Sequence, residues 1–463
     1  MSGTFGSLNT ALSALRYNQV VLDTANNNIA NAGTDGYTRQ RVESSSVSGG
    51  VSGLWSRAET SPGYGVSVDG ITRMTDAVLD ARSRQEHSKQ AYLDTRQTVL
   101  ERVESGIGEP GDSGVSAALS NFRSALQDLS NQPGQAASRS QALATASTVA
   151  DAFRVQVSNI DSEAAQQRAT AQALVTQVNT VAGSLASTNA AIARSGLGGS
   201  VDNTLLDQRD KLAAQLADLT GAVSTVQTDG TIDVTLGGVA LVTGNQASQL
   251  AIASGITATG EADGSPVTFS ISDGATTTTV PDGQLGQLGA TAELLNTTLP
   301  AYRAGLDAVA KTFADQMNAQ QSAGYDALGA AGSPLFSYDP ANVAGSLSVA
   351  ITDPDGLAAS GVAGGAVDGS NADAMAALSD ADSAYQRLVN GFGTQVQSAQ
   401  QVAANQQALT TQVDNAHEQL AGVNTDEETL NLMTAQRGYE AAARVLTTMD
   451  SILDTLIHHT GVG

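Results

Sequence analysis

The two ends of the chain carry apolar side chains at the spacing of a paired helix. Near the start an apolar residue recurs every seven positions, at Leu8, Leu15, Leu22 and Ile29. Near the end apolar residues alternate in steps of three and four, at Leu432, Ala435, Tyr439, Ala442, Leu446, Met449, Leu453 and Leu456. This spacing is typical of a coiled-coil seam, and so narrow a stripe needs a second helix to cover it. We therefore predict that both ends serve assembly rather than catalysis.

The partner of each stripe is either the other stripe or the same segment of a neighbouring molecule. We expect the whole first stripe to face the last part of the second, which comprises Leu446, Met449, Leu453 and Leu456. Burial in an ordinary intramolecular core is the alternative interpretation. Because Ala occupies several seam positions, an isolated pair gains little stability, and we expect it to be marginal until neighbours pack against it.

The composition excludes several classes of function. The 463 residues include 22 Lys and Arg against 46 Asp and Glu, for a formal net charge of -24. A nucleic-acid-binding protein needs cations to neutralise phosphates, and an anionic membrane surface repels an acidic chain, so we predict neither kind of partner. The chain has no cysteine, which excludes disulfides, thiol catalysis and cysteine metal sites. No stretch approaches the ~18 apolar residues of a membrane span.

Three short segments resemble catalytic or metal-binding motifs, and each lacks something that the chemistry needs. Residues 111–114 read Gly-Asp-Ser-Gly, as in serine proteases, but they lie between two predicted helices. His417 begins like a zinc-protease motif, yet Ala421 stands where the second ligand belongs. Residues 353–356 hint at a calcium loop without the acidic residue that closes it. We therefore predict no catalytic residue, no metal and no cofactor.

The pattern along the chain predicts a nested, mainly α architecture of long helices with a small inserted β domain. The ends, 1–75 and 421–463, form a terminal coiled-coil inner domain with an extended segment. Residues 76–220 and 289–420 form a helical middle domain. Residues 221–288 form an outer β domain, because Thr, Val, Gly and Asp-Gly pairs dominate that stretch.

Breaker residues bound the individual elements. Helices are expected over 7–31 and 136–193, and an irregular extended segment follows the first of them. The dipeptide Asp229-Gly230, set between alternating apolar residues, is the strongest hairpin signal in the chain. Gly422 interrupts the last helical stretch.

An acidic cluster, Asp426-Glu427-Glu428, opens the C-terminal stripe. Negative charge is favourable at a helix N-terminus, where Asn424 or Thr425 would be the cap. A contact with a neighbouring subunit is the alternative interpretation.

Taken together, these segments resemble a known family. The run ALSALRYNQVVLDTANNNIANAGTDGYTRQRV (11–42) is similar to the N-terminal signature of flagellar rod, hook and hook-associated proteins. The run GVNTDEETLNLMTAQRGYEAAARVLTTMDSILDTLI (422–457) resembles their C-terminal signature. Two interior runs, LLDQRDKLAAQLADLTG (205–221) and DGTIDVTLGGVALVTG (229–244), resemble the hook-associated members at the junction between hook and filament.

The resemblance implies a structural protein of the bacterial flagellum, without enzymatic activity, that joins hook to filament. Its terminal helices would pair into the inner coiled-coil layer of a helical tube, and its β domain would face outward. Export through the flagellar type III apparatus without a cleaved signal peptide would place it outside the cell. The implied partners are copies of the same chain in a helical ring, the hook protein, hook-associated protein 3 and, before secretion, an export chaperone.

The stripes and the resemblance together mark an assembly interface. Its helical part consists of Leu8, Leu15, Leu22, Ile29, Leu432, Tyr439, Leu446, Met449, Leu453 and Leu456. The residues Asn26, Asn27, Asn31 and Tyr37 are expected to organise the turn after the first helix and its subunit contacts.

Two alternatives stay open. One is another flagellar axial protein, such as hook-associated protein 3 or a hook or rod subunit. The other is a secreted adhesin or hydrolase carried on a flagellar scaffold. The second alternative would need a catalytic or ligand-binding constellation in the β insert, and the sequence of 221–288 shows none.

Overall fold

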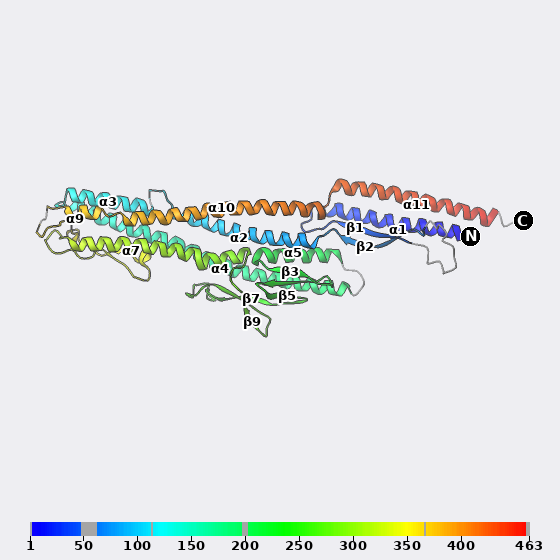
Figure 1. Ribbon diagram of the computed structural model, residues 1–463, viewed down its shortest axis with the longest axis horizontal. Helices are drawn as coiled ribbons and strands as arrows, with labels where there is room; N and C mark the ends of the chain where they lie inside the picture. The colour runs from blue at the N-terminus through cyan, green and yellow to red at the C-terminus, as the bar shows by residue number, and fades with distance from the viewer. Residues whose placement is uncertain (1, 48–62, 113, 197–201, 365–366, 460–463) are drawn as a thin grey trace.

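Two helices from opposite ends of the sequence lie side by side at one end of an elongated molecule (Figure 1). The computed structural model describes residues 2–47, 63–112, 114–196, 202–364 and 367–459. The first helix, α1 (Ser2–Asn31), and the last, α11 (Thr425–His459), run antiparallel, so both chain ends lie at the same tip of the rod. The apolar stripes explain the pairing, since each stripe covers the other.

A two-stranded hairpin packs against α1. The strands β1 (Gln40–Ser46) and β2 (Val66–Arg73) pair antiparallel. The backbone N–H of Val66 donates to the Ser13 hydroxyl in α1 (3.2 Å). The sequence predicted only an irregular extended segment here, because each alternating run is short. Pairing of the two runs with each other satisfies their backbone groups.

The middle of the rod is a bundle of helices. Its longest members are α2 (Ala77–Ile107), α3 (Val115–Asn131), α4 (Ala136–Gly196), α7 (Leu299–Ala323) and α10 (Asp380–Ala421). The shorter elements are α5 (Asn203–Thr220), α6 (Gly286–Glu293), the π-helical turn η1 (Leu294–Thr298), α8 (Val343–Ser346), the 3-10 turn η2 (Pro354–Gly356), α9 (Ser370–Ala376), β10 (Phe336–Ser337) and β11 (Ser348–Val349). Because α10 runs along α2, segments far apart in sequence hold the bundle together (Figure 1).

Polar caps and glycines set the ends of these helices. The Asp76 carboxylate accepts hydrogen bonds from the N–H groups of Val78 and Leu79 and so begins α2. Gly108 ends that helix in the left-handed region, at φ 66°, which a residue without a Cβ adopts at no steric cost. Gly422 separates α10 from α11, at the break that the sequence predicted.

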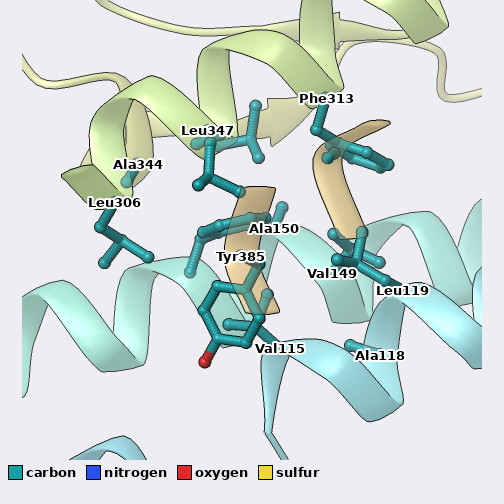
Figure 2. Close-up of a cluster of buried hydrophobic side chains, with 14 of the residues drawn as sticks. Val115, Ala118, Leu119, Val149, Ala150, Leu306, Phe313, Ala344, Leu347 and Tyr385 are labelled. Atoms are coloured by element: carbon teal, nitrogen blue, oxygen red, sulfur yellow. The ribbon is translucent and has the colours of Figure 1, made fainter. Parts of the chain in front are cut away.

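Aromatic and aliphatic side chains fill the bundle. The Phe122 ring lies edge-on to Phe313, with 5.9 Å between centroids, and Phe313 tilts against Phe336 at 4.9 Å. Figure 2 shows this core, where side chains of several helices converge. Those labelled there are Val115, Ala118, Leu119, Val149, Ala150, Leu306, Phe313, Ala344, Leu347 and Tyr385. Most of the chain's few phenylalanines thus lie in this core, and small side chains such as Ala118 and Ala150 allow close packing between the helices.

The β insert consists of two small antiparallel sheets on one side of the rod (Figure 1). The first has the order β3 (Val223–Val226), β4 (Ile232–Leu236), β5 (Val239–Thr243), β6 (Gln246–Ala247), and the second β7 (Gln249–Ser254), β8 (Thr268–Ser272), β9 (Thr277–Thr279). The predicted Asp229-Gly230 hairpin joins β3 to β4, with Gly230 at φ 83°. Alternate residues of β4, from Ile232 to Leu236, face inward and are buried.

The second half of α4 shares a core with these sheets. Leu185 of α4, Leu216 of α5 and Ile232 of β4 belong to this core, and each is 0% exposed. Since α4 also contributes to the bundle core, one continuous helix fixes the insert to the bundle. The fold is mainly α with a small β insertion and paired terminal helices, as the sequence predicted.

Candidate functional site

Three contacts, each between a polar side chain of α1 and a residue of α11, fix the register of the terminal pair. They join Ser7 to Met449, Asn18 to Gly438, and Asn28 to Glu428. The first is a hydroxyl–sulfur contact of 3.9 Å, and the last is an amide–carboxylate hydrogen bond of 3.2 Å. From one contact to the next the chain advances by 11 and then 10 residues in α1 and recedes by the same steps in α11. The helices therefore keep one antiparallel register over nearly their whole length.

This register differs from the pairing that we expected from the sequence. The expectation set the whole first stripe against Leu446–Leu456, and it is wrong for most of that stripe. The register instead sets Leu22 level with Thr434 and Ile29 level with Glu427. In an antiparallel pair each step forward in one helix meets a step back in the other, so the contact spreads over both helices.

The most buried seam positions hold small side chains. Ala11 and Ala25 of α1 are 6% and 2% exposed, and Ala435 and Ala442 of α11 are 4% and 8% exposed. The larger seam residues are each only half buried: Leu8, Leu15, Leu22, Ile29, Leu432, Leu446, Met449 and Leu453. The alanines let the helices approach closely. The leucines lie at the edges of the contact, so part of their apolar surface remains exposed to solvent.

A buried asparagine holds the turn after α1 to α11. Asn28 is 0% exposed, and its Nδ2 donates to Glu428 Oε2 (3.2 Å) and to the carbonyl of Gln40 (2.9 Å). Its Oδ1 accepts from the Tyr37 hydroxyl (2.8 Å) and from the N–H of Gln40 (3.0 Å). All the hydrogen-bonding capacity of the amide is thus used inside the protein. Together with Arg39, these side chains form the terminal polar junction, defined here as Asn28, Tyr37, Arg39 and Glu428.

Arg39 and Glu428 form the ion pair of the terminal polar junction. Arg39 Nη2 lies 2.7 Å from Glu428 Oε1, and Arg39 Nε donates to the same oxygen at 2.8 Å. The side chain of Glu428 is 4% exposed and that of Arg39 22%, so water screens the pair little. The Arg39 N–H also donates to the carbonyl of Ala421, at the end of α10 (2.8 Å). The junction therefore ties the turn both to α11 and to the bundle.

The acidic cluster at 426–428 lies at the start of α11, as predicted. The Asn424 side chain accepts from the N–H groups of Asp426 (3.0 Å) and Glu427 (3.3 Å) and so caps the helix. Arg39 of the same chain also reaches Glu427 Oε2, at 3.0 Å. The contact of this cluster with a neighbouring subunit stays a prediction.

The electrostatics of the junction keep Tyr37 protonated. Burial raises the pKa of Tyr37 to about 12, and the negative charges of Asp207 and Glu428 act in the same direction. The phenol is therefore neutral at physiological pH and available as the donor to Asn28.

The remaining predicted residues lie apart from these contacts. Asn31 Nδ2 donates to Asn27 Oδ1 (2.8 Å) across the last turn of α1, whereas Asn26 is exposed. Tyr439 is 40% exposed, so it lies at the border of the seam. The side chain of Leu456 lies outside the described residues.

A second polar group, the arginine–aspartate bridge (Arg73, Asp207, Arg209 and Asp210), joins the hairpin to α5. Arg73 Nε lies 2.8 Å from Asp207 Oδ1, and Arg73 Nη2 lies 2.6 Å from Asp210 Oδ2. Arg209 Nε donates to Asp210 Oδ1 (2.9 Å), and Arg209 Nη1 donates to the carbonyl of Gly230 in the insert. The bridge therefore connects the hairpin, α5 and the β insert.

Each charge of the bridge has a partner. Burial raises the pKa of Asp207, and the charge of Arg73 and hydrogen bonds from Thr38 oppose that rise. Beside it, Lys211 Nζ lies 2.7 Å from Asp35 Oδ2 in the turn after α1. This arrangement positions elements relative to one another, and it leaves no unpaired base or nucleophile among its four residues.

Sequence reasoning missed most of these polar residues, namely Asn28, Arg39, Arg73, Asp207, Arg209 and Asp210. A signal existed for a register-setting polar residue at Asn18, which falls on the seam between Ala11 and Ala25, whereas Asn28 only precedes the seam position Ile29. Polar residues at seam positions commonly fix register. Arg73 and Asp210 are separated by 137 residues, and no spacing in the sequence indicates that they meet.

Neither a metal-binding cluster nor a membrane-spanning helix occurs among the described residues. Within the described ranges no three His, Asp or Glu side chains gather closely enough to hold a metal ion. Nε2 of His417, the residue that opens the zinc-like motif, instead lies 3.1 Å from Oδ1 of Asp80 in α2. Among the helices that the structure describes, none combines the length and apolar character needed to cross a bilayer.

Comparisons with known proteins agree with this arrangement. The family model described as the flagellar hook-associated protein FlgK helical domain matches residues 100–336, and that of the flagellar basal body rod FlgEFG protein C-terminal region matches residues 419–458. Flagellar hook-associated protein 1 of Bacillus subtilis (strain 168) is 30% identical over 100% of both chains. Flagellar hook-associated protein 1 of Escherichia coli (strain K12) is 27% identical over 97% of this chain and 99% of its own.

A solved structure shares the fold. The flagellar hook junction protein FlgK from Burkholderia pseudomallei aligns with a TM-score of 0.65 at 18% identity, covering 73% of this chain and 99% of that chain. An elongated helical subunit with paired termini and a rod-type C-terminal segment is an axial protein of the bacterial flagellum. More narrowly, the chain belongs to the flagellar hook-associated protein 1 family. It is a structural protein and not an enzyme, and the matches do not favour the alternative axial proteins or a secreted adhesin or hydrolase.

Proposed function

We propose that this chain is the adaptor that joins hook to filament, and that α1 and α11 carry its assembly. The observation that carries the proposal is the antiparallel pair at one tip of the rod, whose leucines stay half buried. A narrow pair rich in Ala buries little apolar surface alone. Packing by neighbouring copies supplies the remaining stabilisation, so polymerisation and completion of the seam are coupled.

Further apolar side chains on the terminal pair support contacts with neighbouring copies. In α11, Leu430 is 65% exposed, Met433 47%, Val445 43% and Ile452 42%, and in α1 Leu12 is 38% exposed. Single exposed apolar residues are ordinary, but a series along one helix is typical of an interaction surface. In a helical ring this surface would meet the terminal pair of the next copy.

The predicted interface residues take different roles in this proposal. The seam leucines hold α1 to α11 within one chain and present their exposed sides to the next chain. Asn27, Asn31 and Tyr37 shape the turn, while Asn26 and Tyr439, which are exposed, contact neighbours.

The place of the chain in the flagellum implies its other partners. The ring would contact the hook protein on one side and hook-associated protein 3 on the other. The proposed domain limits put 1–75 and 421–463 in the inner layer and 221–288 outside, and the position of the insert on one side of the rod is consistent with an outer domain (Figure 1). Before secretion through the flagellar export apparatus, a chaperone would cover the terminal stripes.

Electron microscopy of hooks from a strain that lacks this protein tests the proposal. We expect bare hooks, with filament subunits lost to the medium, and attached filaments once the intact chain is supplied. Normal filaments on the hooks of the deletion strain would overturn the adaptor role.

Removal of α11 (Thr425–His459) is the companion experiment. Because none of the described side chains of α11 belongs to the bundle core or the insert core, the shortened chain is expected to fold and to remain monomeric. A shortened chain that still restores filaments would show that the terminal pair does not carry assembly.

A further inference from the structure

A groove lies between the first turns of α2 and the start of β3. Its volume is about 520 Å³, with Arg82, Arg84 and Ser88 on the α2 side and Ala222 and Val223 on the opposite side. The strand β3 is at the edge of its four-stranded sheet, so on one side no strand of the described chain pairs with it. An open strand edge beside a groove is a place where another chain can dock.

The two arginines of the groove have no direct ion-pair partner among the described residues, although the charge of Arg82 helps to lower the pKa of Glu86 one turn away. Within the described parts of the chain, neither Arg82 nor Arg84 makes an ion pair or a hydrogen bond, although acidic residues outnumber basic ones by 46 to 22. Burial lowers the pKa of Arg84, and the carboxylates of Asp210 and Asp80 offset that effect only from beyond ion-pair distance. A guanidinium in such a position gains from an additional carboxylate.

Ser88 gives a second, independent indication of a missing ligand. It is 3% exposed, and its Oγ makes no hydrogen bond to any residue that the structure describes. Buried hydroxyl groups are normally hydrogen-bonded, and a serine in a helix commonly bonds the carbonyl one turn earlier. Because Ser88 lines the same groove as the arginines, an acceptor bound there would satisfy all three side chains.

The groove also has two exposed valines in its lining. Val78 is 79% exposed and Val223 67%. The valines and the free edge of β3 would pack against the backbone of an extended segment, while the arginines would bind its carboxylates.

We propose that this groove binds an acidic, extended segment of a second copy of this chain. Carboxylate oxygens of that segment accept hydrogen bonds from Arg82, Arg84 and Ser88, and its backbone covers Val78 and Val223. Charge decides the partner, because a chain of net charge -24 carries many carboxylates on its surface. The inference rests on the proposed function, in which copies of the chain surround one another in a ring.

Photo-cross-linking in assembled flagella tests the inference. A photoreactive amino acid replaces Val223, and the cells express a mixture of isotope-labelled and unlabelled chains so that links between copies differ in mass from links within one copy. We expect a link from position 223 to an acidic peptide of a second copy. The double variant R82E/R84E is expected to reduce the yield of that link by about tenfold or more, as loss of a charge-assisted contact does.

Two further variants keep the test interpretable. Arg387 is an exposed arginine of α10 that makes no ion pair in the described chain and does not line the groove, so R387E is the matched control and should leave the link unchanged. The variant R82Q/R84Q removes the charges without reversing them, and its unfolding curve is compared with that of the wild type to exclude misfolding. Should R82E/R84E misfold, R82Q/R84Q alone decides the result.

The outcomes separate this inference from the proposed function. The groove is not a site for a second copy if position 223 links only within its own chain, links to a different protein, or does not link. The same conclusion follows if the link persists in the folded charge variants. If any of these results occurs while immunogold still labels the wild-type chain at the hook tip, the groove is rejected and the adaptor role is retained. Absence of label at the junction would reject both.

Discussion

Gly438 of α11 lies directly against the Asn18 side chain of α1, and a methyl group on Gly438 would lie 2.5 Å from Asn18 Oδ1. Asn18 Nδ2 donates a hydrogen bond to the carbonyl of Ala14 (2.7 Å), so this amide donor is satisfied within its own helix. A polar residue in the seam thus requires a partner without a side chain, and this requirement fixes the spacing and register of the terminal pair.

Replacement of Gly438 by Leu is expected to separate α1 from α11 and to stop incorporation at the hook tip. The added side chain would collide with Asn18, and overpacking of this kind typically costs about 1–3 kcal/mol. The measurement is the amount of variant protein in purified hook–filament assemblies. Gly438→Ala combined with Asn18→Ala removes the collision and should assemble, since Ala is also the better helix former. Normal assembly of Gly438→Leu would show that the register is not needed.

Loss of the Glu428 carboxylate is expected to loosen the start of α11. Glu428→Ala removes the ion pair with Arg39 and the acceptor of one hydrogen bond each from Arg39 and Asn28, a loss of about 1–3 kcal/mol in local stability. Hydrogen–deuterium exchange of the first turns of α11 measures it. The control is Glu427→Ala, whose side chain is 58% exposed and pairs with the same arginine, with an expected loss of at most about 1 kcal/mol. Equal exchange in the two variants would mean that burial of Glu428 is unimportant.

Tyr37→Phe is expected to remove a pH dependence of the unfolding free energy that appears only at alkaline pH. Folding raises the pKa of Tyr37 from 10.0 to about 12, so the folded chain favours the protonated phenol. This stabilisation is fully present below pH 10 and is lost as the pH rises toward 12. Near neutral pH the variant lacks one hydrogen bond, worth about 1 kcal/mol. Denaturant unfolding at several pH values should show the gap between wild type and variant closing in alkali, and a constant gap would contradict the assignment.

The His417–Asp80 pair is expected to stabilise the packing of α10 on α2 at low pH. The hydrogen bond to Asp80 raises the pKa of His417 above 6.5, and Asp414 and Asp210 act in the same direction. The stabilisation is fully present below pH 6.5 and is lost as the pH rises through the raised value.

The thermal unfolding midpoint measures this effect. His417→Gln should lower the midpoint more at about pH 5.5 than at about pH 8.5. His458→Gln is the control, because His458 is exposed and faces Asp454 on its own helix. A deficit of His417→Gln that does not change with pH would rule out the charged pair.

Local periodicity explains which parts of the fold were predictable. The helix expected over 136–193 is α4 (Ala136–Gly196), and the Asp229-Gly230 turn joins β3 to β4. In both cases the residues that determine the element are close to it in the sequence. The hairpin of β1 and β2 was missed because neither strand has a strong pattern and only their mutual pairing stabilises them.

The details of the site depend on long-range geometry that the sequence does not display. The bond from Asn28 to Glu428 spans 400 residues, and its register depends on where α10 ends and how the chain turns after α1. The stripes predicted that the ends pair, but they fit several registers equally well. Polar residues such as Asn28 and small ones such as Gly438 select one of them.

The central claim is that pairing of α1 with α11 carries assembly at the hook tip, and immunoelectron microscopy of one pair of variants tests it most directly. Leu453 is half buried in α11, and Ser451, two residues earlier, is exposed. Cells that produce Leu453→Asp are expected to have bare hooks without label at the tip, whereas cells that produce Ser451→Asp should have labelled junctions and attached filaments. Labelled junctions and normal filaments in the Leu453→Asp cells would contradict the account.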